Sequence, residues 1–190
     1  MKAYCINLPE RPERWDEFRK QKIPFEVQRF DAIRDNPGWK GCTKSHLKVF
    51  QEITEYPCIV FEDDCLMLHD WAMVEQCMIQ LPADWDMLYL GATLNEKLEP
   101  YSKNLYRIKN AWTTHAIIYN SNKVPEFILS NKSNIKKIDV FITENVLPIF
   151  QCFITYPLIA TQRPGISDVL RKSTFTDYKI ITDNYEKYVK

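Results

Sequence analysis

The sequence contains no long run of apolar residues. Only a short apolar stretch precedes Pro9, too short for the apolar core of a signal peptide. No later segment approaches the ~20 apolar residues that span a membrane. We therefore expect a soluble, cytoplasmic protein without a transmembrane segment.

An excess of charge of either sign is also missing. The 25 lysines and arginines balance the 25 aspartates and glutamates. Proteins that grip nucleic acid through its phosphates usually carry a strong basic excess. The balance therefore disfavours a nucleic-acid partner.

The sequence has no CxxC pair, and its six cysteines, at positions 5, 42, 58, 65, 77 and 152, lie mostly within apolar segments. This pattern is typical of reduced, buried thiols rather than of a zinc site or a disulfide framework.

Glycine is scarce, with four residues, and no repeat, low-complexity tract or flexible linker divides the chain. At 190 residues and 45% hydrophobic content, the chain can form one sizeable core. We expect a single domain over residues 1–190, in which about 172–190 form a covering C-terminal tail.

Strand-like and helix-like patterns alternate along the chain. This alternation predicts an α/β fold, with a mostly parallel mixed sheet flanked by helices. The expected strands cover 2–8, 25–30, 58–62, 86–91, 112–119 and 153–160, and the expected helices cover 12–22, 43–54, 71–80 and short segments after Lys123 and Asp139.

Consecutive carboxylates, Glu62, Asp63 and Asp64, follow the apolar strand at 58–62. Because strand side chains alternate, Glu62 and Asp64 should face one side and Asp63 the other. Like charges placed together at a strand end favour a cation, and carboxylate oxygens suit Mg²⁺ or Mn²⁺. The alternative is that these are solvated turn or capping residues.

Several distinctive segments follow one another along the chain: INLPERPERW, RFDAI, GCTKSHLKVFQEI, CIVFEDD, WDMLYLG, THAIIYN, IDVFI and PLIATQRPGISDV. In this order they resemble glycosyltransferase family 25, which includes lipooligosaccharide and collagen galactosyltransferases. The resemblance implies a GT-A-like fold and an inverting transfer from a nucleoside diphosphate sugar, most simply a UDP-sugar, with Mn²⁺ or Mg²⁺ as cofactor. It also implies that Asp64 holds the metal, with Glu62 nearer the ribose or a metal-bound water.

The same resemblance places donor-binding residues at the ends of neighbouring strands. Arg11 and Arg14 follow the first strand and could contact the donor, or pair with Glu10 or Glu17 at the surface. The remaining expected donor contacts are Asn7, Asp31, Ala32, Ser45, Glu62, Asp63, Gln162, Ser167 and Asp168.

Histidines and carboxylates elsewhere are candidates for acid–base chemistry. His46 lies on an apolar helical stripe, which favours a structural role over a catalytic one. Asp139 is our candidate for the general base, since an inverting transfer needs a group that takes the acceptor proton. The alternative for Asp139 is an ordinary helix cap, with Glu144 as the next candidate base.

Other functions remain open from the sequence. Clustered carboxylates also occur in metal-dependent phosphoesterases and nucleases. An inactive nucleotide-sugar-binding scaffold is a further alternative. For a transferase, the acceptor would be a saccharide such as lipooligosaccharide, with a hydroxymethylated DNA base or a protein hydroxyl as alternatives.

Overall fold

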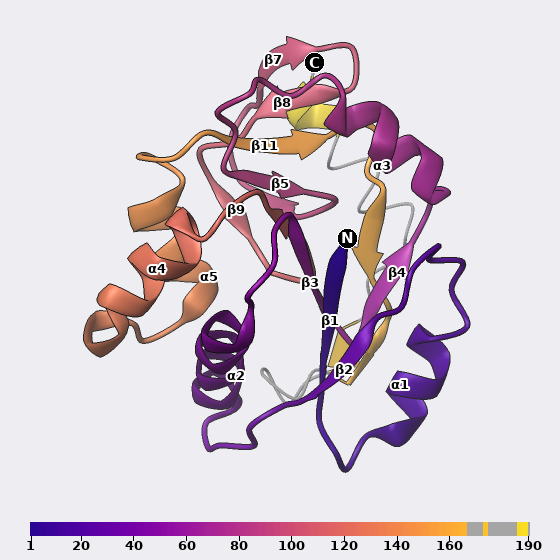
Figure 1. The fold of residues 1–190 in the computed structure, drawn as a ribbon, viewed down its shortest axis with the longest axis vertical. Helices are drawn as coiled ribbons and strands as arrows, with labels where there is room; N and C mark the ends of the chain where they lie inside the picture. Colours follow the sequence, from indigo (N-terminus) through magenta and orange to yellow (C-terminus); the bar gives the residue numbers. More distant parts are fainter. Residues whose placement is uncertain (167–172, 175–185, 190) are drawn as a thin grey trace.

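The fold centres on one mixed sheet (Figure 1). The computed structural model describes residues 1–166, 173–174 and 186–189. The sheet has eight strands in the order β2-β1-β3-β10-β5-β11-β8-β7. Their bounds are β1 Lys2–Asn7, β2 Gln28–Asp31, β3 Cys58–Glu62, β5 Met87–Tyr89, β7 Glu99–Ser102, β8 Leu105–Arg107, β10 Ala116–Tyr119 and β11 Cys152–Thr155.

Strand direction changes within this sheet. β1 pairs in parallel with β2 and β3, and β5 pairs in parallel with β11. β10 and β8 each run antiparallel to both of their neighbours. The predicted α/β fold with a mixed sheet is confirmed, and its parallel part is concentrated around β1.

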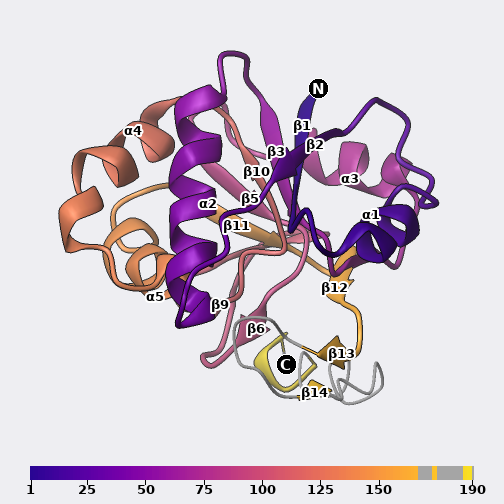
Figure 2. The ribbon, with the colours of Figure 1, turned by 90° about the horizontal axis from the view of Figure 1, so that it is seen from below.

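Helices cover both faces of the sheet (Figure 2). α2 (Gly38–Glu52), α4 (Lys123–Ser130) and α5 (Ile138–Phe141) lie on one side, and α1 (Pro12–Phe18) and α3 (Trp71–Met78) lie on the other. A 3₁₀ turn at Lys132–Asn134 follows α4, and a π-helix at Ile142–Val146 follows α5.

Alternation along β3 divides the apolar residues between two cores. Cys58 and Val60 pack into the core beneath α2, α4 and α5. Ile59 and Phe61 pack into the core beneath α1 and α3. Each face of β3 is therefore buried, which explains its continuous apolar sequence.

Short strands extend the fold beyond the main sheet. They form three two-stranded ladders, which pair β4 (Cys65–Met67) with β12 (Ala160–Gln162), β6 (Thr93–Leu94) with β9 (Ala111–Trp112), and β13 (Gly165–Ile166) with β14 (Ser173–Thr174).

Several predicted boundaries were wrong. The helix expected from residue 43 begins at Gly38, because Pro37 precedes it in an extended conformation and ends the loop. The strand expected over 112–119 is split into β9 and β10, since Thr113 has a φ of 77°. The strand expected over 153–160 is interrupted near Pro157, which has no N–H to donate to a ladder.

Most of the expected tail at about 172–190 lies outside the described residues. Of the described part, Tyr188 and Val189 pack against the α2-side core, and the Tyr188 carbonyl accepts a 2.8 Å hydrogen bond from the backbone N–H of Leu98. Within residues 1–166, 173–174 and 186–189, no helix is long and apolar enough to cross a membrane.

Candidate active site

A pocket of about 460 Å³ opens where the parallel strands β1, β2 and β3 end. Residues that follow these strands line it, including Leu8, Ala32 and Asp64, and residues of α2 and of the start of α5 complete the lining. Ligands of open α/β sheets bind outside the carboxyl ends of the strands. The position of this pocket therefore marks it as the candidate active site.

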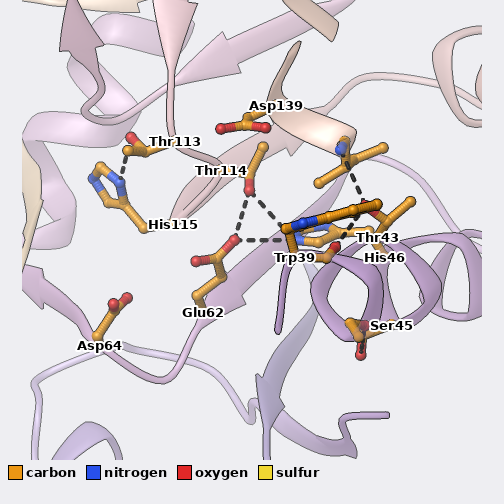
Figure 3. Close-up of polar contacts among 12 residues, drawn as sticks. Trp39, Thr43, Ser45, His46, Glu62, Asp64, Thr113, Thr114, His115 and Asp139 are labelled. Atoms are coloured by element: carbon orange, nitrogen blue, oxygen red, sulfur yellow. Dashed lines mark hydrogen bonds and ion pairs between the residues drawn. The ribbon is translucent and has the colours of Figure 1, made fainter. Parts of the chain in front are cut away.

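Glu62 occupies the centre of a hydrogen-bonded group (Figure 3). Its Oε1 lies 3.0 Å from Nε2 of His46 on α2 and accepts a 2.6 Å hydrogen bond from the Thr114 hydroxyl. Burial opposes ionisation, but His46 and Thr114 outweigh it and lower the pKa of Glu62. Glu62 is therefore held as a fixed carboxylate at the pocket wall.

Asp63 turns toward α1. Its Oδ2 accepts a 2.7 Å hydrogen bond from the Asn7 amide, and its Oδ1 pairs with the Arg14 guanidinium at 3.0 Å. Burial nevertheless raises the pKa of Asp63 above its usual value. The contacts of Glu62 with α2 and of Asp63 with α1 follow the alternation of side chains along β3.

Asp64 is the least compensated carboxylate of the cluster. Its Oδ2 accepts a 3.1 Å hydrogen bond from the Gln162 amide, whereas its buried Oδ1 has no hydrogen-bond partner among the described residues. Burial, followed by the charges of Glu62 and Asp63, raises the pKa of Asp64 to about 7. A buried carboxylate oxygen without a donor, beside other carboxylates, fits a divalent cation.

Close backbone contact fixes α2 beside the pocket. A Cβ on Gly41 would lie 2.3 Å from the Ile33 carbonyl oxygen, so the helix approaches the loop after β2 as closely as only glycine permits. Ser45 donates to the Gly41 carbonyl and accepts from the Ile33 N–H at 2.8 Å. The hydroxyl of Ser45 therefore secures the helix to this loop.

Thr113 brings its neighbours into the site through an unusual backbone conformation. A φ of 77° is strained for a β-branched residue. The following residue, Thr114, bonds Glu62, and the Thr113 hydroxyl lies 3.1 Å from Nδ1 of His115. Burial lowers the pKa of His115 to about 4, so this ring stays neutral near pH 7.

The structure brings only some of the predicted donor residues together. Arg14, Ala32, Ser45, Gln162 and the acidic cluster line the pocket. Ser167 and Asp168 lie outside the described residues.

The remaining predicted donor residues lie away from the pocket lining. Asn7 is buried, and its side-chain amide donates hydrogen bonds to Asp63 and to the Arg11 carbonyl. It therefore positions the acidic cluster without lining the pocket. Arg11 pairs with a nearby glutamate, but with Glu13 rather than with Glu10 or Glu17. Asp31 points outward from the edge strand β2, with 72% of its side chain exposed, because the preceding Phe30 faces the core.

Asp139 reaches the pocket from α5. It is the second residue of this short helix, and Lys137 occupies the position that caps it. Its Oδ1 accepts a 2.8 Å hydrogen bond from the N–H of Val140. Glu144, the other candidate base, is exposed in the π-helix and does not line this pocket.

Cys42 and His46 of α2 also approach Glu62 closely. One potential ligand atom from each of the three residues lies within 4.8 Å of the others. His46, which the sequence assigned to the core, is indeed buried, but its ring also lines the pocket.

Sequence reasoning missed several pocket residues: Arg34, Asp35, Trp39, Thr93, Thr113, Thr114 and Lys137. Most of them lie in loops or first turns with no distinctive spacing. The polar pair Thr113 and Thr114, within an otherwise strand-like segment, was the one available signal.

Comparisons with known proteins identify the family of this chain. The model of glycosyltransferase family 25, described as an LPS biosynthesis protein family, matches residues 36–143. A search of curated proteins found no match. Among solved structures, HddC from Yersinia pseudotuberculosis superposes with a TM-score of 0.46 at 11% identity, covering 98% of this chain and 76% of HddC, a likeness too low to support an argument.

The family match spans more than half of the chain and includes α2, the acidic cluster, Thr114 and Asp139. It therefore covers much of the pocket lining, whereas Leu8, Arg14, Ala32 and Gln162 lie outside the matched residues. The chain belongs to glycosyltransferase family 25 and is a glycosyltransferase.

Proposed function

We propose that the pocket binds a nucleoside diphosphate sugar, preferably UDP-linked, with Mn²⁺ or Mg²⁺, and transfers its hexose or pentose to a hydroxyl with inversion. The observation that carries this proposal is the acidic cluster at the wall of a pocket beyond the parallel strands. A phosphate-bearing ligand bound there would lie at the usual ligand position of an open α/β sheet.

Asp64 and Glu62 are the proposed metal ligands. The partnerless Oδ1 of Asp64 and the raised pKa of this carboxyl fit a divalent cation. When bound, such an ion neutralises the charge that develops on the departing diphosphate. Arg14, held at 3.0 Å from Asp63, also lines the pocket and would add positive charge there.

The donor contacts follow from the pocket lining. Ala32 and Ser45 border the end nearest β2, where we place the nucleoside, and Gln162, which bonds Asp64, would contact the diphosphate. We retain Asn7 and Asp63 as residues that position the cluster. Ser167 and Asp168 remain proposed donor contacts from their place in the sequence.

Donor class can be tested by ligand-dependent stability. A ligand at 100 times its Kd stabilises the native state by about 2.7 kcal/mol. We expect UDP with Mn²⁺ to raise the melting temperature more than ADP or GDP with Mn²⁺. Equal shifts from all three nucleotides would remove the uridine assignment.

Asp139 is the proposed general base, since it lines the pocket from α5 and so shares the pocket with the acidic cluster. It would accept the proton of the attacking hydroxyl. Asp139→Asn keeps an acceptor for the Val140 N–H, so kcat should fall about 10²-fold or more while donor affinity changes little.

The matched control for this variant is Glu144→Gln, at the exposed carboxylate of the next helix. Steady-state kinetics with varied donor concentration separates an effect on kcat from an effect on donor affinity. An Asp139→Asn enzyme with normal kcat would return Asp139 to a structural role and move the search to Glu144 or Asp168.

A saccharide is the proposed acceptor, as the LPS biosynthesis description of the family suggests. Modified DNA and protein hydroxyls are the alternatives, and the balanced net charge disfavours DNA. Transfer of labelled sugar to an oligosaccharide, a hydroxymethylated oligonucleotide and a hydroxylysine peptide would distinguish them. Preferential labelling of either alternative would contradict the saccharide proposal.

A further inference from the structure

Cys42, His46 and Glu62 bring sulfur, nitrogen and oxygen to one point of the pocket wall. One ligand atom from each lies within 4.8 Å of the others. His46 Nε2 and Glu62 Oε1 are already 3.0 Å apart. Cys42 and His46 are four residues apart on α2 and so share one helical face.

We propose that these residues form a site for a thiophilic divalent cation of the Zn²⁺ class, distinct from the proposed Asp64 site but sharing Glu62 with it. Zn²⁺ takes thiolate, imidazole and carboxylate ligands at about 2.0–2.3 Å. Ligand atoms around one tetrahedral ion are then about 3.3–3.8 Å apart, so small side-chain rotations close the set.

The sulfur and nitrogen ligands of this site disfavour Mg²⁺ and Mn²⁺, the ions proposed to bind with the nucleotide. Mg²⁺ and Mn²⁺ favour oxygen ligands, whereas thiolate favours Zn²⁺. All three residues line the pocket, so a fourth coordination position would face its interior.

The helical ligands are held in place before any ion binds. The close approach of Gly41 to Ile33 and the two hydrogen bonds of Ser45 fix the turn of α2 between Cys42 and His46. Nδ1 of His46 is buried and has no hydrogen-bond partner in the described part of the chain. In the metal-free protein Nε2 faces the Glu62 carboxylate, which only accepts hydrogen bonds, so ligation through Nε2 as a neutral imidazole would require its hydrogen to move to Nδ1.

This inference revises the expectation that the six cysteines are reduced, buried thiols rather than part of a zinc site. The third ligand, Glu62, lies on β3, so no short cysteine-histidine motif indicates the site. Folding places the end of β3 beside α2. On binding, the Cys42 thiol would release its proton to solvent.

Because Glu62 belongs to both proposed sites, Zn²⁺ binding should affect sugar transfer; this expectation rests on the proposed function. An ion on Cys42, His46 and Glu62 would withdraw Glu62 from the Asp64 site. Zn²⁺ should therefore inhibit the Mn²⁺-supported reaction, and excess Mn²⁺ should relieve the inhibition.

Binding itself can be tested without donor or acceptor, using Co²⁺ as a spectroscopic probe. Chelator-treated protein titrated with Co²⁺ should develop a thiolate-to-cobalt charge-transfer band, and Zn²⁺ should remove it. Cys42→Ser should abolish the band, and His46→Gln should weaken Co²⁺ binding about tenfold or more, since even loss of an outer-shell partner costs 10–100-fold. The matched control is Cys77→Ser, at a buried cysteine of α3 on the opposite face of the sheet, which should keep the band.

Thermal unfolding checks that each variant is folded, and Cys42→Ala replaces Cys42→Ser if the serine variant is not. No band in the wild-type protein, or an equal band in a folded Cys42 variant, overturns the proposal. Because no nucleotide sugar is present, these outcomes are independent of whether the protein transfers UDP-linked sugar.

Discussion

Replacing Asp64 by asparagine should stabilise the metal-free protein above neutral pH. Burial, then the charges of Glu62 and Asp63, raises the pKa of Asp64 from 3.8 to about 7. Between these values the folded state keeps a proton that the unfolded state has lost. The wild-type protein therefore loses stability as pH rises from about 4 to about 7, and the loss is complete above the folded-state pKa.

The size of the effect follows from the difference between the two pKa values. It corresponds to an upper limit of about 4 kcal/mol. Asp64 lines an open pocket, so water screens part of this energy. In the presence of EDTA, the difference in unfolding free energy between the asparagine variant and wild type should shift by at least about 1 kcal/mol in favour of the variant as pH rises from 5 to 8.

Urea unfolding at several pH values measures this gain directly. Asp84→Asn is the matched control, because it removes the same charge from an exposed position, and its stability relative to wild type should not change with pH in this way. Adding Mn²⁺ should stabilise wild type more than Asp64→Asn. Parallel pH profiles for wild type and Asp64→Asn would refute the reasoning.

Further predictions concern the backbone and the buried histidine. Gly91→Ala should lower the free energy of unfolding by about 1–3 kcal/mol or more, because its Cβ would lie 1.9 Å from the Ala160 carbonyl oxygen. Urea unfolding measures this loss, and unchanged stability would contradict the contact. His115 has an ordinary pKa of 6.5, and burial lowers it to about 4, so the unfolded state binds the proton first and wild type should lose up to about 3 kcal/mol as pH falls from 6.5 to 4. His115→Gln should flatten that part of the pH profile of unfolding, and an unchanged slope would show that His115 is not responsible.

The sequence predicted those parts of the molecule that depend on local pattern. The apolar run of β3 and the carboxylates after it predicted a buried strand with an acidic end. Alternation also predicted that Glu62 and Asp63 would face opposite sides, since this depends only on strand geometry. Direct contacts with α2 and α1 show the same division.

The remaining parts depend on contacts between distant segments. The conformation of Thr113, which turns Thr114 onto Glu62, has no signature in single-residue propensities. Asp31 was expected at the site because it ends a strand next to β1, but β2 is an edge strand whose last side chain points outward. Cys42 meets Glu62 only after α2 packs beside β3.

Release of UDP from a panel of UDP-sugars, with Mn²⁺ and with excess EDTA, tests most directly whether the acidic pocket is a metal-dependent donor site. We predict that the wild-type protein releases UDP from at least one donor with Mn²⁺, and that EDTA or Asp64→Asn abolishes release. Full release in EDTA, or full activity of Asp64→Asn, would contradict the account.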